Sequence, residues 1–441
     1  NAGDLTISAN GFIDDISNNA DFTLSATGIL NIKSTAGIST TAATGNIRVT
    51  GARTYTAGSV VFYNGSAAQV LGNAMPGTCN ITIDNTSGVT LSANSTTTGL
   101  LTMANGTLNM NTFTLTVGSL TGSSNITATS GSRLLTVGSD NSSPAAYSGV
   151  ISNGGGTVSL TKTGTGTLTL SGTNTYTGTT TISAGMILLN SAGALPGGIG
   201  STGGTSNLSL NGGVLGLGAG DFTRGIGTGA TQVQFNTASS GFAAYGADRI
   251  VNFGGASAAV TWAGGDFVEN GDALILSAAD ATHTITVQNP ISTNGAVRTI
   301  QVDNGSAATD AVISGVISST GGITKTGTGL LRLTATNTNT GVTTISAGVL
   351  SVATIGNGGV AGNLSQASNA AGNLVLNGGT LQYTGATAST DRNYTLPNGT
   401  TSSIDITTAG TNLTISGAST GTSGALTKIG SGTLTLAGAN A

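Results

Sequence analysis

The chain has little charge, little proline and almost no cysteine. Only 6% of its 441 residues are charged, against about 25% in a typical globular domain, and proline occurs 5 times. Disordered segments are usually rich in both, so the composition argues against disorder. Glycine occurs 72 times, and the hydrophobic fraction is 37%. Because compact domains rarely exceed about 250 residues, these figures favour an elongated protein with a thin core.

The scarcity of basic and apolar clusters excludes two kinds of partner. The 12 Lys and Arg residues are scattered and the net charge is −4, so no basic patch exists to neutralise phosphates and we expect no nucleic-acid partner. The longest apolar runs, such as LILSAA from Leu274, fall far short of the ~18 residues of a membrane helix, so we expect no membrane-spanning segment.

Cysteine and histidine are too few to suggest catalysis. The single cysteine, Cys79, cannot form an internal disulfide, and His283 is the only histidine that could activate it as a base. We therefore expect a buried, inert cysteine. His283 alternates with threonines in ATHTITVQ, and we expect it on the outside or at the edge of a strand. We predict no cofactor.

Three stretches of the sequence are close copies of one another. LTKTGTGTLTLSGTN begins at Leu160, ITKTGTGLLRLTATN at Ile323 and LTKIGSGTLTLAGAN at Leu426. The first two continue in parallel into TYTGTTTISAG and TNTGVTTISAG. Each copy places a glycine two residues after its lysine and an asparagine twelve residues after it: Lys162, Gly164, Asn174; Lys325, Gly327, Asn337; and Lys428, Gly430, Asn440.

The local pattern is that of short strands. In TLTL (167–170) leucine and threonine alternate, which places them on opposite faces of a strand. Threonine suits a pleated surface, and the runs stop at SG, NG, GG or AG, which are turn signals. The pattern continues through the whole chain and its repeats vary in length, which favours a solenoid over a sandwich or propeller. We expect threonine and asparagine to stack in register along one face.

The stretch GGTVSLTKTGTGTLTLSGTNTYTGTTTISAGMILLN resembles the autotransporter-associated β-strand repeat, also called the passenger-associated transport repeat. The copies from residues 323 and 426 resemble it too, and residues 207–290 resemble the spacers between such repeats. The first 145 residues look more generally like bacterial surface β-repeats. The resemblance implies a right-handed parallel β-helix within a large, secreted bacterial surface protein, many of which are adhesins or stalks.

We therefore predict an all-β chain, folded as an elongated right-handed parallel β-helix (β-solenoid). Residues 1–145 would form a solenoid with irregular surface-protein-type repeats. Residues 146–441 would continue it with the three repeats, near 160–190, 323–350 and 426–441. Residues 220–300 are less regular, and we expect a bulge or an outward loop there.

Two groups of residues are candidates for a binding or cross-linking site. Asp266, Glu269 and Asp272 are the densest acidic group, and their oxygens could bind calcium, although a solvated turn is favoured because the GGxGxD spacing of calcium solenoids is absent. The repeat lysines could cross-link to the asparagines or mark a carbohydrate site. We favour a simpler role: lysines at strand edges that prevent lateral pairing, and asparagines that satisfy turn backbone groups or stack as ladders.

The function that fits best is structural: an extracellular rod, stalk or filament on a bacterial surface, and not an enzyme. The last copy stops at Asn440, partway through its own pattern, so we expect either a longer chain or end-to-end self-association of uncapped coils. The main alternative is an adhesin that binds glycans or host surfaces, for which Trp262, Tyr245 and Phe242 are the only local aromatic group. A polysaccharide-degrading β-helix enzyme is less favoured, because it would need clustered acids.

Overall fold

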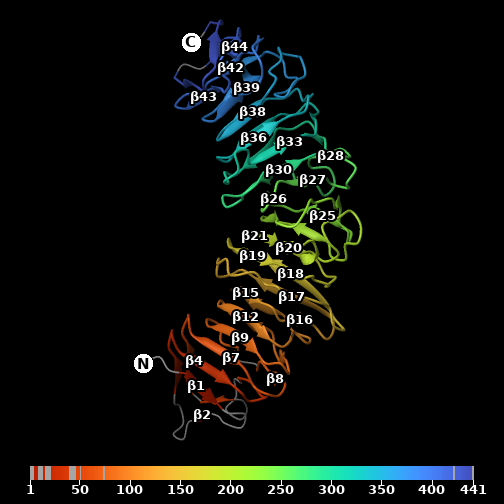
Figure 1. The fold of residues 1–441 in the computed structure, drawn as a ribbon, viewed down its shortest axis with the longest axis vertical. Coiled ribbons are helices and arrows are strands. Elements are labelled where there is room, and N and C mark those ends of the chain that lie inside the picture. Colours follow the sequence, from red (N-terminus) through yellow and green to blue (C-terminus); the bar gives the residue numbers. More distant parts are fainter. Residues whose placement is uncertain are drawn as a thin grey trace. The chain divides into compact units, whose positions relative to one another are not determined.

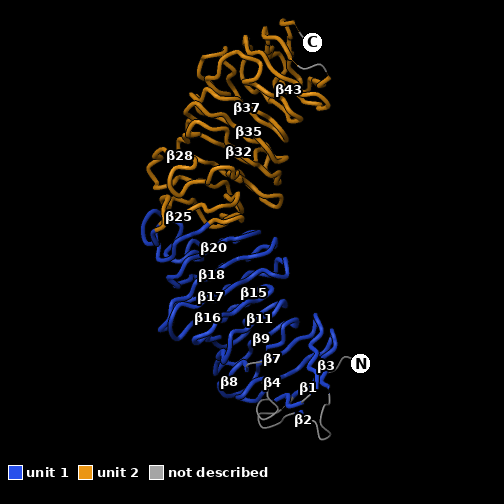
Figure 2. Tube along the Cα trace, turned by 180° about the vertical axis from the view of Figure 1, so that it is seen from behind, with its two compact units in different colours: residues 1–209, 229–231 blue, residues 210–228, 232–441 orange. Residues whose placement is uncertain are grey.

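The computed structural model describes residues 4–7, 13–14, 21–38, 46–49, 51–72, 75–420 and 423–439. It divides into two compact units, coloured separately in Figure 2. Unit 1 comprises residues 1–209 and 229–231, and unit 2 comprises residues 210–228 and 232–441. The change in repeat type expected near residue 145 lies inside unit 1.

Unit 1 is built from parallel strands that stack coil upon coil in three long sheets (Figure 1). Ile81 lies beside Leu101, and Leu101 beside Leu120, so one coil takes about 20 residues there. The first sheet contains β1 (Asp4–Ile7), β4 (Ile29–Ile32), β7 (Val60–Tyr63), β9 (Asn80–Asp84), β12 (Leu100–Asn105) and β15 (Ser119–Gly122). The second contains β8 (Gln69–Val70), β10 (Val89–Thr90), β13 (Leu108–Asn109) and β16 (Ile126–Thr127).

The third sheet of unit 1 contains two of the strands of the first repeat. It includes β11 (Ser95–Thr96), β14 (Leu115–Val117), β17 (Ser132–Val137), β18 (Thr157–Lys162) and β20 (Thr180–Ile182). Shorter pairs are β2 (Ile13–Asp14) with β5 (Ile47–Arg48), β3 (Phe22–Leu24) with β6 (Arg53–Tyr55), and β19 (Thr167–Leu170) with β21 (Met186–Leu189). A 3-10 turn, η1 (Ala192–Ala194), follows β21, and β22 (Leu208–Leu210) lies where the main segment of unit 1 ends at Ser209.

Unit 2 repeats this architecture. One sheet contains β23 (Val214–Leu217), β26 (Ser240–Ala244), β29 (Ala273–Leu276), β32 (Arg298–Val302), β35 (Ile323–Thr326), β37 (Thr343–Ile345), β39 (Leu374–Leu376), β42 (Tyr394–Thr395) and β45 (Ser419–Thr420). A second contains β27 (Arg249–Val251), β30 (Ile285–Val287), β33 (Ala311–Ile313), β36 (Leu330–Leu333), β38 (Val349–Val352), β40 (Thr380–Tyr383), β43 (Thr401–Ile406) and β46 (Ala425–Ile429).

The remaining strands of unit 2 form shorter groups. They are β28 (Val260–Thr261), β31 (Ile291–Ser292) and β34 (Ile317–Ser318); β41 (Ala388–Thr390), β44 (Asn412–Ile415) and β47 (Thr433–Leu436); and β24 (Gly225–Ile226) with β25 (Gln232–Phe235). A second 3-10 turn is η2 (Ala371–Asn373). The pairs formed within each unit are parallel, and the described residues contain no α-helix, so the prediction of an all-β parallel solenoid is confirmed.

The core of each coil is thin and apolar, as the alternation predicts. Along β18 and β19, inward residues such as Leu160, Leu168 and Leu170 are 0–1% exposed, and the threonines between them are half-buried. Each coil therefore buries only one side of each strand, and its open backbone groups pair with the coils on either side.

Residues 220–300 do not loop out but form enlarged coils. Phe242 lies beside Leu276, and Val251 beside Val287, so a coil takes about 35 residues there. Aromatic rings fill the wider interior, with centroids 5.0 Å apart for Phe222 and Phe242. The buried cluster comprises Phe222, Phe235, Phe242, Phe253, Trp262 and Phe267. Of the two expectations for this segment, the bulge agrees with the enlarged coils, which enclose larger side chains, and the outward loop does not.

Candidate functional site

The lysine of the first repeat is buried, contrary to the expectation of an exposed lysine at a strand edge. Lys162 ends β18 and is 1% exposed. Its ammonium group donates to the carbonyl oxygens of Thr163 and Gly164, at 2.5 and 2.9 Å. Burial lowers the pKa of Lys162 to about 8, an effect that the charge of Asp140 partly offsets. The lysine therefore caps the turn that follows its own strand.

The second repeat has the same arrangement within unit 2. Lys325 is 0% exposed and donates to the carbonyl oxygens of Thr326, Gly327 and Ala347, at 2.7, 2.8 and 3.3 Å. The Ala347 oxygen belongs to the next coil, so this ammonium group links two coils. Burial lowers the pKa of Lys325 to about 8 as well.

The third repeat shows the same lysine without a covering coil. Lys428 lies on β46, a terminal strand of its sheet in the described part of the chain. Its side chain is exposed but still donates to the Gly430 oxygen at 2.5 Å. Lys325 and Lys428 lie in different sheets of unit 2. These two repeat lysines therefore do not lie in one column of stacked residues.

The repeat glycines shape the turns that these lysines cap. Gly164, Gly327 and Gly430 have φ values of 64°, 72° and 76°, in the left-handed region that favours glycine. A Cβ atom at Gly327 would lie 2.3 Å from the Val302 carbonyl oxygen. The turn therefore excludes a side chain at this position for two independent reasons.

The repeat asparagines form a clamp across neighbouring coils. The Asn174 side chain accepts from the Ile151 N–H at 2.8 Å and donates to the Ala194 oxygen at 2.7 Å. Its backbone N–H donates to the Gly193 oxygen at 2.9 Å. Asn174 is 2% exposed, so a single buried residue joins the preceding coil to the loop that follows the repeat.

Asn337 makes the corresponding contacts in the second repeat. Its side chain accepts from the Ile317 N–H at 2.8 Å and donates to the Asn363 oxygen at 2.5 Å. The loops that the two clamps hold contain matching segments, Gly193-Ala194-Leu195 and Gly362-Asn363-Leu364, and both leucines are 1% exposed. The asparagine of the third repeat, Asn440, lies outside the described residues.

A sequence signal for this burial existed. Lys162 lies two residues after Leu160 on β18, so the alternation of side chains places both on the inward face. Asn174 lies four residues after Leu170, the last residue of β19, and continues the same alternation. Charge and polarity argued for the outside, and the alternation was the better guide.

The other residues considered as candidate site residues do not lie together in one site. In the described part of the chain, no three or more His, Cys, Asp or Glu side chains lie close enough together to hold a metal ion, so Asp266, Glu269 and Asp272 are not gathered into one group. His283 is half-buried, and its Nδ1 lies 2.8 Å from the Thr282 hydroxyl oxygen. Cys79 is buried, as expected, and burial raises the pKa of its thiol to about 12.

The aromatic residues considered for glycan binding are mostly inside. Trp262 and Phe242 are 1% and 0% exposed. Tyr245 is half-buried and donates to Asp280 at 2.5 Å. Only Tyr245 therefore presents any ring surface to solvent.

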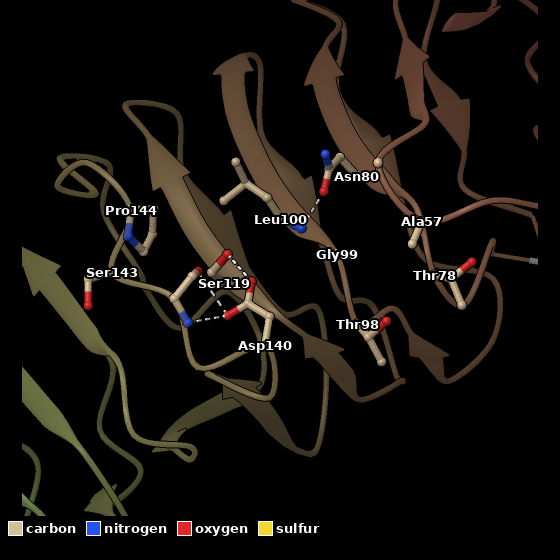
Figure 3. A pocket seen from close by; sticks show the side chains of 12 residues that line it. Ala57, Thr78, Asn80, Thr98, Gly99, Leu100, Ser119, Asp140, Ser143 and Pro144 are labelled. Carbon is tan, nitrogen blue, oxygen red and sulfur yellow. Dashed lines mark hydrogen bonds between the residues drawn. The ribbon is translucent and has the colours of Figure 1, made fainter. Parts of the chain in front are cut away.

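A groove of about 360 Å³ lies on unit 1 (Figure 3). The Ser119 hydroxyl donates to an Asp140 carboxylate oxygen at 2.6 Å, and Ser142 donates to the other through its N–H and its hydroxyl, both at 2.9 Å. The lining residues come from successive coils and are mostly small or polar: Ala57, Gly58, Thr78, Asn80, Thr98, Gly99, Leu100, Ser119, Asp140, Ser142, Ser143 and Pro144.

No helix in the described residues is long and apolar enough to cross a membrane.

The passenger-associated transport repeat family matches residues 160–189, 323–352 and 426–441. The chain is also similar to the adhesin BmaC autotransporter of Brucella suis biovar 1 (strain 1330), with 33% identity over 228 residues. That match covers 41% of this chain and 7% of the relative, so the chain spans a small part of the relative's length. No solved structure matches.

Proposed function

We propose that this chain, which carries three passenger-associated transport repeats, is a structural stalk segment of a surface passenger protein, exposed outside a bacterial cell. The observation that carries the proposal is the use of the repeat's polar residues. The side chains of Lys325 and Asn337 form their hydrogen bonds with backbone groups of their own and adjacent coils. The repeat thus joins coil to coil, which is what a stalk requires.

The last coil that the structure describes has exposed apolar residues. Ile429 and Leu436 are 41% and 38% exposed, whereas Leu333, the counterpart of Leu436 in the second repeat, is 1% exposed. A following coil would cover both residues and pair with the open edges of β46 and β47. This coil would come from the same polypeptide or from a second copy in head-to-tail contact.

Electron microscopy of the purified chain tests this proposal. Fibres of uniform width that lengthen with protein concentration support end-to-end assembly, whereas discrete short particles support a stalk whose following coil belongs to the same polypeptide. Replacing Leu436 with Lys should shorten any fibres, and the matched change Leu134→Lys, at a residue 39% exposed within unit 1, should leave them unchanged. Compact particles without a parallel solenoid would refute both forms of the proposal.

A second candidate function, adhesion, is favoured by the groove on unit 1. Its hydroxyl and amide groups could contact a glycan or another polar surface, and the relative from Brucella suis is named an adhesin. Binding of the chain to a glycan array, reduced by Asp140→Ala, would support adhesion. An array without signal, measured with chain shown to be folded by circular dichroism, would count against it.

A further inference from the structure

The two complete repeats follow the same backbone path around one buried threonine. Thr180 begins β20 and Thr343 begins β37. Upstream, the Thr175 N–H donates to the Ile151 oxygen at 3.0 Å, and the Thr338 N–H donates to the Ile317 oxygen at 2.9 Å. Side chains that differ between the repeats can therefore be compared position by position.

In the first repeat the hydroxyl of Thr180 is fully paired. The Tyr176 hydroxyl lies 2.7 Å from the Thr180 hydroxyl oxygen, and the Ser206 hydroxyl lies 2.9 Å from it. All three residues are at most 1% exposed. The phenol ring of Tyr176 fills the space, and its hydroxyl satisfies the threonine.

In the second repeat both of these partners are replaced. Asn339 occupies the position of Tyr176, and Gly372 that of Ser206. Unlike the buried Ser206, Gly372 is exposed, and a Cβ atom built there meets no atom within 4 Å. The Asn339 side chain is shorter than that of tyrosine by most of a phenol ring, yet Asn339 and Thr343 remain 1% and 0% exposed.

The polar atoms at this position are left without protein partners. The Asn339 Oδ1 and Nδ2 atoms and the Thr343 hydroxyl are buried and form no hydrogen bond to another group of the described chain. An unpaired buried polar group costs about 1–3 kcal/mol, and buried polar groups nearly always pair with protein or ordered water. Three such atoms at one position call for a ligand.

We propose that the second repeat holds a buried hydration site between Asn339 and Thr343. The Asn339 side chain offers an acceptor at Oδ1 and a donor at Nδ2, and the Thr343 hydroxyl can donate or accept. Water matches this set because it both donates and accepts, whereas a metal ion would satisfy only the acceptors and an anion only the donors. A buried water takes about 30 Å³ and usually has two to four polar partners, a number that the Asn339 amide and the Thr343 hydroxyl can supply. Water thus replaces the tyrosine hydroxyl of the first repeat.

A crystal structure of the full chain, at a resolution that shows ordered water, tests the site directly. We expect a water within hydrogen-bonding distance of both Asn339 and Thr343, and none between Tyr176 and Thr180. A dry, closed contact at Asn339, or an Asn339 amide paired with another protein group, would overturn the proposal.

Reciprocal substitutions test it in solution. Asn339→Tyr should displace the water, pair with Thr343 and slow amide hydrogen exchange in β37 several-fold. Tyr176→Asn, the matched control, should create the same site in unit 1 and accelerate exchange in β20. Faster exchange in β37 of Asn339→Tyr would mean that the space is already filled by protein, which rejects the site.

Thr343→Val gives an independent answer if Asn339→Tyr does not fold. Valine has nearly the shape of threonine but no hydroxyl. If the hydroxyl holds water, its loss leaves that water under-coordinated and exchange in β37 becomes several-fold faster. If the hydroxyl is simply unpaired, valine removes a buried polar group at no cost and exchange becomes slower, which contradicts the proposal.

Discussion

Replacing Asn337 with Ala should open the solenoid locally around the second repeat. The substitution removes two side-chain hydrogen bonds, to the Ile317 N–H and the Asn363 oxygen, worth about 1 kcal/mol each. It also leaves the buried N–H of Ile317, a residue 1% exposed, without its partner, which costs about 1 kcal/mol or more. The expected loss is about 3 kcal/mol, or roughly a hundredfold in the local opening equilibrium.

Amide hydrogen exchange measured by mass spectrometry is the appropriate assay, because coils of a solenoid contact only their neighbours and can open locally. Peptides that contain Ile317 and Asn363 should exchange roughly a hundredfold faster in Asn337→Ala, while peptides from unit 1 keep their rates. The matched control is Asn304→Ala, because Asn304 is exposed, and it should change nothing. Unchanged exchange at Ile317 would refute the clamp.

Asn337→Asp separates the two halves of the clamp. The carboxylate keeps an acceptor for the Ile317 N–H but sets a negative oxygen against the Asn363 carbonyl oxygen. Burial and this repulsion should raise the pKa of the introduced carboxyl group. Its folded state would then bind more protons than its unfolded state, so stability should rise as the pH falls below the raised pKa. A variant whose stability relative to the native chain does not depend on pH would show that the side chain does not face this oxygen.

Three further outcomes follow from the buried groups. Burial lowers the pKa of Lys325 to about 8, below its value of about 10.4 in the unfolded chain, so the unfolded state binds more protons between about pH 8 and about pH 10.4. The free energy of unfolding of the native chain, measured by urea denaturation, should therefore rise by at most about 3 kcal/mol relative to that of Lys325→Met over this pH range. A difference between the two chains that does not change with pH would contradict this. Gly327→Ala should destabilise the chain by at least about 1 kcal/mol, because its φ is positive and its Cβ would meet the Val302 oxygen; equal melting temperatures would refute the turn geometry. Cys79, with a pKa raised to about 12, should resist iodoacetamide at pH 8 in the native chain and react in urea; rapid native labelling would show that it is accessible.

The fold was predictable because one rule governs every coil. Alternation of leucine and threonine, as in β19, requires strands with one buried face, and the absence of helical periodicity leaves only β architectures. The repeats then favour stacking over closure. The parallel pairing of β17 with β18 and of β35 with β37 follows from the same argument.

The site was predictable only in part, because polarity and position gave opposite signals. Lys162 lies two residues after Leu160 on the same strand face, which alternation places inside, whereas an isolated lysine is almost never fully buried. Position prevailed because a turn of carbonyl oxygens surrounds the ammonium group. The aromatic cluster around Phe253 was not predictable, since local sequence does not reveal how many residues a coil will take.

The buried lysine and asparagine also explain how coils of nearly uniform composition find their register. Columns of leucine, isoleucine and valine can slip along the strand by two residues and still bury apolar side chains. A slip of the coil that contains β35 against its neighbours would carry Lys325 away from the Ala347 oxygen and Asn337 away from the Ile317 N–H, leaving buried polar groups unpaired. Lys428 keeps its contact with Gly430 although no coil of the described chain covers it. The lysine cap is therefore intrinsic to its own strand and turn, whereas the Ala347 contact of Lys325 and the asparagine clamp require the neighbouring coils and make their register specific.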